Sequence, residues 1–229
     1  MKAKILLGCP TCDLYEYCLF EYLTAIKELS YNNYDILLVD NSKDNRYSNL
    51  LKQNGINVIK DEHKERAIDR IVSSRNLLRK YAIENNYDYL LIIEQDVIPP
   101  KEVIEKLLNH HKDITSGVYF TQTIYDGQKE IVPVLYKQYD EEAGKMRYFT
   151  QEELTGSLEE ARNAGLGCIL ISKEVLEKIS FRYVQDKPAF DDVWFANDVR
   201  GLGYKIYADT SVKCKHLILK RPWTWGQLK

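Results

Sequence analysis

Hydrophobic and polar positions in the first half of the chain alternate between two kinds of segment. Short apolar runs typical of buried strands occur at residues 3–7, 34–39, 56–59 and 87–93. Segments with apolar side chains at helical spacing lie at residues 15–29, 47–53 and 69–85. Strands that alternate with helices of this length predict βαβ units and a mostly parallel sheet covered by helices on both faces.

The second half has a more mixed pattern. After a helical segment at 101–111 come an apolar run at 114–120 and a tyrosine-rich span at 125–150 that predicts hairpins and loops. A strand at 168–171 precedes a helix that Ser172 is expected to cap. The segment DDVWFANDVRGLG predicts a helix that starts at Asp191. No linker-like run and no internal repeat divides the chain, so we expect one α/β domain.

Polar side chains follow three of the predicted parallel strands. Ligands of such sheets bind outside the carboxyl ends of the strands. The residues at those ends are Thr11 and Asp13, Asp40 and Asn41, and Glu94 and Asp96. Glu94 and Asp96 are two residues apart, so an extended backbone would point both carboxylates to one side, where they suit Mg²⁺ or Mn²⁺. The alternatives are solvated turn acids or acids that cap the next helix.

Composition limits the classes of function. The chain has 32 basic and 34 acidic residues and a net charge of −2, so no overall positive field attracts nucleic acid. No run of eighteen apolar residues predicts a membrane span, and the N-terminal apolar run is too short for a signal peptide, so we expect a cytoplasmic protein. The GCPTC motif allows a redox or zinc site, but no second CxxC or HxxxH accompanies it.

The segment LLIIEQDVIPPKEVIEKLL resembles the region around the DxD motif of GT-A glycosyltransferases, especially those related to family 2. The order of other segments agrees: ILLGCPTCDLYEYCLFEYL, LLVDNSKDN, IVSSRNLLRKYA, AGLGCILISKEVLEKI and AFDDVWFANDVRGLGYKIYAD. The resemblance covers residues 4–216. It implies a GT-A, Rossmann-like sheet with a smaller mixed-strand acceptor subregion. Residues 1–112 would form the nucleotide-binding half, 113–216 the acceptor-side half and 217–229 a tail.

The resemblance implies a cation site. Asp96 matches the second acid of the motif, whereas Glu94 replaces the first, which leaves direct ligation by Glu94 open. His216 matches the ligand expected near the C-terminus. An imidazole ligand favours Mn²⁺ over Mg²⁺. The alternative for His216 is a surface histidine among lysines.

The resemblance also implies catalytic and acceptor residues. Asp192 matches the general base of inverting transfer, and Asp191 would cap the helix or contact the acceptor. Both could instead simply cap the helix N-terminus. Trp194 could stack on an acceptor sugar or belong to the core. Gly167 could let the backbone approach the sugars or serve a turn.

A further set of residues would bind the nucleotide-sugar donor: Pro10, Thr11, Asp40, Arg75, Glu94 and Gln95. A plain turn role for Asp40 and a helix-surface position for Arg75 are the alternatives.

Taken together with these residues, the resemblance implies a Mn²⁺- or Mg²⁺-dependent, inverting hexosyltransferase with a UDP- or GDP-sugar donor and a glycan or lipid-linked acceptor. A non-catalytic binding module of the same fold and a sugar-phosphate nucleotidyltransferase are the alternatives. The tail combines Lys215, Lys220 and Arg221 with Trp223 and Trp225, a mixture that could contact a membrane surface, a lipid-linked acceptor or a second subunit, or pack on the body.

Overall fold

The computed structural model describes residues 2–125, 127–140, 145–187 and 189–224. Strands of the first half are β1 (Ile5–Thr11), β2 (Tyr34–Asp40), β3 (Asn57–Lys60), β4 (Tyr89–Ile93) and β5 (Val97–Ile98). Its helices are the 3₁₀ helix η1 (Asp13–Cys18) and the α-helices α1 (Leu19–Lys27), α2 (Arg46–Gln53), α3 (Ala67–Glu84) and α4 (Val103–Leu108).

Strands dominate the second half. They are β6 (Ile114–Val118), β7 (Phe120–Tyr125), β8 (Gln128–Pro133), β9 (Leu135–Asp140), β10 (Lys145–Tyr148), β11 (Leu158–Ala161), β12 (Asn163–Ala164), β13 (Cys168–Ser172), β14 (Ile206–Lys213) and β15 (Lys215–His216). The helices are α5 (Lys173–Lys178), α6 (Asp191–Gly201) and the short 3₁₀ helices η2 (Gln151–Glu153) and η3 (Ile218–Lys220).

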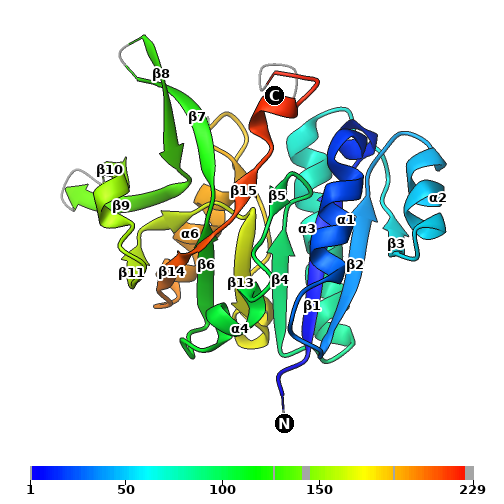
Figure 1. The fold of residues 1–229 in the computed structure, drawn as a ribbon, viewed down its shortest axis with the longest axis horizontal. Coiled ribbons are helices and arrows are strands. Elements are labelled where there is room, and N and C mark those ends of the chain that lie inside the picture. The colour runs from blue at the N-terminus through cyan, green and yellow to red at the C-terminus, as the bar shows by residue number, and fades with distance from the viewer. Residues whose placement is uncertain (1, 126, 141–144, 188, 225–229) are drawn as a thin grey trace.

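A central sheet takes strands from both halves of the chain, in the order β11-β14-β6-β13-β4-β1-β2-β3 (Figure 1). Strands β3, β2, β1 and β4 pair in parallel, as the alternation of strands and helices predicts. Strand β13 runs antiparallel between β4 and β6, and β14 is parallel to β6. The prediction of an α/β fold with a mostly parallel central sheet is confirmed.

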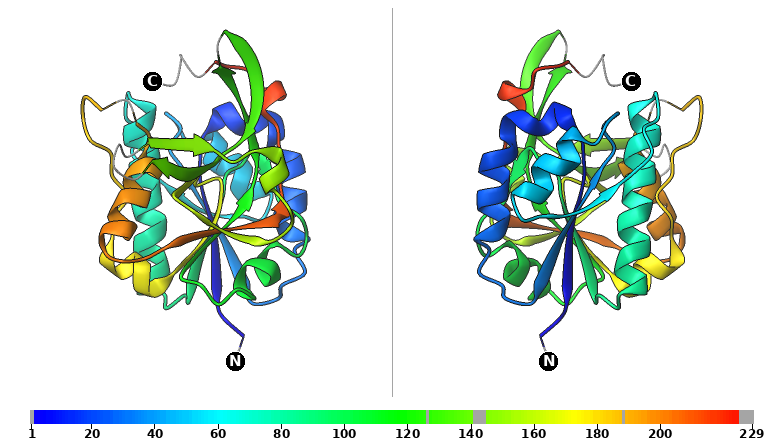
Figure 2. Two further views of the ribbon diagram at one scale, coloured as in Figure 1. Left: turned by 90° about the vertical axis from the view of Figure 1, so that its left-hand side faces the viewer. Right: turned by 90° about the vertical axis from the view of Figure 1, so that its right-hand side faces the viewer.

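Helices cover both faces of this sheet (Figure 2). Leu6, Leu90 and Ile92 belong to the core on the side of α3, α5 and α6. On the opposite side, Leu91 and Ile93 pack with residues of α1, α2 and α4. All four residues from Leu90 to Ile93 are 0% exposed. A strand buried on both faces has to be apolar at every position, which explains the continuous run.

The structure corrects several predicted boundaries. Residues 15–29 do not form one helix, because the 3₁₀ turn η1 precedes α1. The run at 114–120 divides at Tyr119, whose carbonyl accepts the Val134 amide instead of continuing the sheet. Helix α4 is shorter than predicted and is followed by His111 at a φ of 51°. The expected cap of α5 is confirmed, because the Ser172 hydroxyl accepts the Val175 amide at 3.4 Å.

Two segments project past the carboxyl ends of the parallel strands: the β7–β8 hairpin and the C-terminal segment that begins at β15 (Figure 1). The antiparallel pair of β15 and β5 joins the C-terminal segment to the chain just after β4. Among the described residues, no helix is both long and apolar enough to span a bilayer. The fold therefore gathers segments from distant parts of the sequence at one sheet edge.

Candidate active site

A tight turn follows β4, so the prediction that Glu94 and Asp96 share one side of an extended backbone is wrong. The Val97 amide donates to the Glu94 carbonyl at 2.8 Å, which closes a turn over residues 94–97. The turn separates the two carboxylates: Glu94 reaches Arg75 on α3, whereas Asp96 reaches His216. The two acids belong to different clusters.

The first cluster forms around Asp96. His216 pairs with Val97 in the β5–β15 ladder, which brings its imidazole beside the carboxylate. The His216 Nε2 atom lies 3.4 Å from Asp96 Oδ2, and both side chains are almost completely buried. The His216 Nδ1 donates to the Phe120 carbonyl at 2.6 Å. A carbonyl can only accept, so Nδ1 carries the proton of the neutral imidazole and Nε2 has a lone pair available.

Arg221, from the C-terminal segment, completes this cluster. Its Nε and Nη2 atoms lie 2.8 and 2.6 Å from Asp96 Oδ2. Its Nη2 also donates to His216 Nε2. Burial raises the pKa of Asp96, but His216 and Arg221 more than offset this effect and hold the pKa below its usual value. Sequence reasoning placed Arg221 in the tail and missed this role; a basic residue shortly after a candidate histidine ligand was the available signal.

The Asp96–His216 pair fits a divalent cation. Asp96 Oδ1 is buried and has no hydrogen-bond partner among the described residues. With the lone pair of His216 Nε2, it supplies one oxygen and one nitrogen donor, a set that suits Mn²⁺. The described residues contain no group of three or more histidine, cysteine or acidic side chains suited to a metal. Protein sites for Mg²⁺-like ions often supply one or two carboxylates and leave the other positions to phosphates and water.

The second cluster forms around Arg75, which is 3% exposed. Its Nη2 lies 2.5 Å from Glu94 Oε1, and its Nη1 pairs with Asp191. Burial raises the pKa of Glu94; the Arg75 charge opposes this rise and the Asp96 charge adds to it. Both terminal nitrogens of the guanidinium are thus bound to carboxylates. This geometry favours a role for Arg75 in positioning acids, and its predicted donor contact stays a prediction.

Helix α6 begins with two acids that have different environments, and Phe190 is its N-cap. Asp191 is 2% exposed and turns inward to Arg75. The Asp192 Oδ1 accepts the Val193 amide at 2.8 Å. Burial and then the Asp191 charge raise the pKa of Asp192 to about 6, against the opposing effects of the Val193 amide and Arg75. A carboxylate with this pKa is ionised at neutral pH and accepts a proton more readily than an ordinary aspartate.

On the predicted donor side, polar side chains bond mainly to one another. Asp40 is fully buried and accepts the Ser42 amide at 2.9 Å and the Ser48 hydroxyl at 2.5 Å. Gln95 donates to the Tyr15 carbonyl at 2.9 Å and also bonds with Thr11. These residues hold β1, β2, η1 and the β4 turn together. Pro10 pairs with Val39 in the sheet, and its backbone contact with a nucleotide remains a prediction.

On the predicted acceptor side, Gly167 makes room for Tyr119. A Cβ atom on Gly167 would lie 2.7 Å from the Tyr119 ring. The Gly167 amide donates to the Tyr119 hydroxyl at 3.0 Å, and this ring packs edge-on against His216 with 5.2 Å between centroids. Gly167 therefore helps to position the Tyr119 ring that packs against His216. The Arg182 guanidinium lies over the Trp194 ring, with its central carbon 5.2 Å from the ring centroid. The buried indole nitrogen of Trp194 has no hydrogen-bond partner among the described residues.

The cysteine motif lacks the features of a reactive site. Cys9 and Cys12 are both free thiols, and Cys9 is fully buried. Burial raises the pKa of Cys12 to about 11, with a smaller contribution from Asp13 against the opposing Leu14 amide. A nucleophilic or metal-binding cysteine needs its thiolate form, so both thiols are poorly suited to that chemistry at neutral pH.

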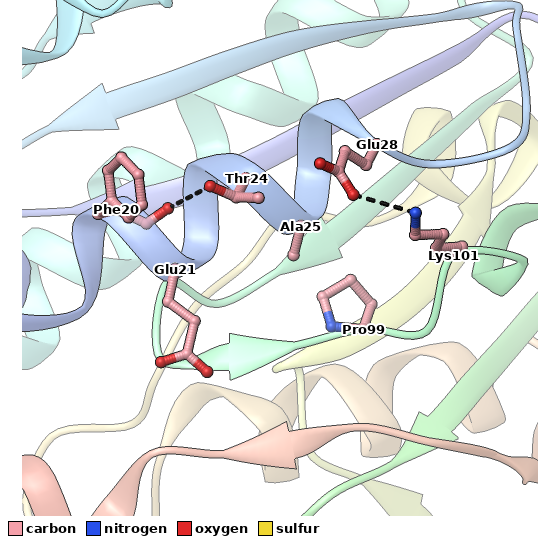
Figure 3. A pocket seen from close by; sticks show the side chains of 7 residues that line it. All are labelled: Phe20, Glu21, Thr24, Ala25, Glu28, Pro99 and Lys101. Carbon is pink, nitrogen blue, oxygen red and sulfur yellow. Dashed lines mark hydrogen bonds and ion pairs between the residues drawn. The ribbon is translucent and has the colours of Figure 1, made fainter.

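A groove of about 400 Å³ lies on the outer side of α1, against the loop after β5 (Figure 3). Phe20 projects beside it and is 85% exposed, and Glu28 bonds with Lys101 across it at 3.0 Å. Its seven lining residues lie outside the predicted site. The groove is therefore separate from the candidate active site, which consists of the Asp96 cluster and the Arg75 cluster at the sheet edge.

Comparisons with known proteins identify the family and the fold. The sequence matches the family model described as glycosyl transferase family 2 over residues 16–180. The fold is similar to that of A197 from STIV, with a TM-score of 0.51 and 18% identity, covering 95% of this chain and 87% of that chain. It is also similar to GalNAc-T7, solved with UDP, GalNAc and Mn²⁺, with a TM-score of 0.64 and 11% identity. That match covers 93% of this chain but only 44% of GalNAc-T7. No curated protein matches the sequence.

Proposed function

The chain belongs to glycosyl transferase family 2, and we propose that it is a metal-dependent, inverting glycosyltransferase that moves a hexose from a nucleotide-sugar donor to a hydroxyl acceptor. The observation that carries the proposal is the division of the site into two clusters. One joins Asp96 to His216, which would bind the cation, and the other contains Asp191, next to which Asp192 has a pKa of about 6. Leaving-group stabilisation and proton removal thus have separate residues.

On the donor side, Asp96 and His216 would hold a divalent cation. When bound, such an ion acts as a Lewis acid that neutralises the negative charge developing on the departing diphosphate. The His216 tautomer is set by the Phe120 carbonyl, so the protein has already oriented the ring for this task. The solved structure of GalNAc-T7 with UDP and Mn²⁺ supports a UDP-linked donor and Mn²⁺ for this chain.

On the acceptor side, Asp192 would act as the general base. As the acceptor oxygen bonds to the anomeric carbon, the bond from that carbon to the diphosphate oxygen breaks, and the hydroxyl proton passes to Asp192. Attack on the face opposite the leaving group inverts the anomeric configuration. Arg75 binds Asp191 rather than Asp192. Burial and the Asp191 charge raise the pKa of Asp192, and the Arg75 charge only partly opposes this rise.

A thermal-shift screen tests donor binding. UDP- and GDP-sugars are added with and without Mn²⁺, and a true donor should raise the midpoint because it binds the folded state alone. The increase should depend on Mn²⁺ and disappear in Asp96→Asn. If no nucleotide sugar stabilises the protein under either condition, the proposal is wrong.

Turnover of the donor found in that screen tests the base. Asp192→Asn should lower the transfer rate by about 10²–10⁴-fold, the usual contribution of a general base, and leave donor binding nearly unchanged. Asp198→Asn is the matched control, because Asp198 lies on the same helix in an exposed pair with Arg182. Donor binding with no transfer to any acceptor, even in the unmodified protein, would favour the non-catalytic alternative.

A further inference from the structure

The Arg221 guanidinium contacts the two side chains proposed to bind the cation. It lies 2.6 Å from Asp96 Oδ2 through Nη2 and also donates to His216 Nε2. The lone pair that Arg221 engages on His216 is the one that a metal ion would need, because Nδ1 is bonded to the Phe120 carbonyl. A cation and Arg221 therefore cannot both use His216 Nε2.

The segment that carries Arg221 also covers part of η1. Trp223 packs edge-on against Tyr15 and Tyr17, with ring centroids 5.1 and 5.7 Å apart. Element η1 begins at Asp13, shortly after the end of β1, where Pro10 and Thr11 lie; we expect these two residues to contact the nucleotide. Arg221 and Trp223 thus link the cation site to the surface beside the end of β1, where we expect the donor to bind.

The residues of this segment before Arg221 have weaker contacts with the body of the protein. Leu217 is fastened by its amide to the Asp96 carbonyl at 2.9 Å. Beyond it, Leu219 is 84% exposed, and Lys220 reaches Glu21 only at 3.5 Å, in an exposed pair. Exposed ion pairs contribute little, so once the Arg221 and Trp223 contacts are released the segment can move while Leu217 and β15 stay in place.

We propose that Arg221 is an exchangeable occupant of the cation site. Without metal, its guanidinium neutralises Asp96 and holds residues 218–224 on η1. When a divalent cation binds Asp96 and His216, Arg221 leaves, and Trp223 moves away from Tyr15 and Tyr17. Metal loading thereby uncovers the surface of η1 beside the end of β1. This inference rests on the proposed function, because it assumes that Asp96 and His216 bind a metal.

Mn²⁺ titration without nucleotide tests the exchange, with free Mn²⁺ measured by electron paramagnetic resonance. Arg221→Ala should bind Mn²⁺ roughly tenfold more tightly than the unmodified protein, a gain on the scale of one charge-assisted hydrogen bond. Arg221→Lys, which keeps the charge but lacks the planar fork, should give an intermediate affinity. Lys220→Ala removes a neighbouring charge that does not contact Asp96 and should leave the affinity unchanged.

Limited trypsin digestion reports the movement directly. Arg221 precedes Pro222 and resists trypsin, so Lys220 is the cleavage site in this segment. Mn²⁺ should accelerate cleavage after Lys220 several-fold in the unmodified protein and have no effect in Asp96→Asn.

The possible failures are distinguishable. If Asp96→Asn abolishes Mn²⁺ binding but Arg221→Ala binds like the unmodified protein, or more weakly, the exchange is wrong and the cation site stands. If none of the variants binds Mn²⁺ and Mn²⁺ does not affect the nucleotide-sugar shift, the metal dependence is wrong and the exchange with it. Circular dichroism of each variant confirms that it is folded.

Discussion

Two arginines have similar electrostatic tasks but are carried by different kinds of element. Arg75 joins Glu94 to Asp191, and Arg221 joins Asp96 to His216. Arg75 projects from the middle of the 18-residue helix α3, whereas Arg221 follows the three-residue turn η3 in the C-terminal segment. The comparison teaches that the element that carries an arginine decides its role. Arg75, on a long helix, is part of the framework, whereas we propose that Arg221, in the terminal segment, can be exchanged.

The largest expected effect is on the stability of the framework. Arg75→Ala leaves Glu94 and Asp191 close together without a counter-charge, so we expect the free energy of unfolding to fall by about 3–5 kcal/mol. Urea denaturation measures this loss. Arg182→Ala removes an arginine from an exposed pair with Asp198 and should change stability by less than about 1 kcal/mol. Equal losses in the two variants would show that Arg75 is not structural.

A smaller loss of stability is expected from a change at Gly167, next to the Tyr119 ring that packs on His216. A Cβ on Gly167 would press on the Tyr119 ring, so Gly167→Ala should destabilise the protein by about 1–3 kcal/mol and weaken Mn²⁺ binding by shifting His216. Gly201→Ala is the control, because a Cβ there meets no atom within 4 Å. Thermal denaturation and Mn²⁺ titration check both variants. Unchanged Mn²⁺ affinity in folded Gly167→Ala would separate Tyr119 from the cation site.

The pH dependence of transfer should report the raised pKa of Asp192, which follows Asp191, the residue bound to Arg75. A base must be deprotonated, and the pKa of Asp192 is raised from 3.8 to about 6 by burial and the Asp191 charge. The rate should therefore fall about tenfold per pH unit below about pH 6. The folded state also binds a proton between about pH 4 and 6 that the unfolded chain releases, so this contribution to stability is present at low pH and lost as the pH rises through 6. If the transfer rate instead falls only below about pH 4, Asp192 is not the base.

The smallest expected effect concerns the exchangeable arginine. Arg221→Ala should lower the free energy of unfolding by less than Arg75→Ala does, because water or a cation can reach Asp96 once the segment moves. Mn²⁺ at a hundred times its dissociation constant should then add about 2.7 kcal/mol, as any ligand specific for the folded state does. Urea denaturation with and without Mn²⁺ measures both values. A loss as large as that of Arg75→Ala would erase the contrast between the two arginines.

The sequence by itself determined the elements and the edge at which chemistry occurs. The continuous apolar run before Glu94 identified a strand buried on both faces, and the polar ends of β1, β2 and β4 located one sheet edge. The start of α6 at Asp191 and the Ser172 cap of α5 were also predictable, because acids favour the first turn of a helix and serine favours its N-cap. Periodicity and local chemistry suffice for features of this kind.

Only the tertiary structure decided which charged groups meet. The turn after β4 separates Glu94 from Asp96, and the β5–β15 ladder brings His216 to Asp96 across more than a hundred residues. Neither the commitment of Arg75 to Asp191 nor the position of Arg221 can be derived from spacing along the chain. The physical reason is that a buried charge requires a partner nearby in space, and long-range packing selects that partner.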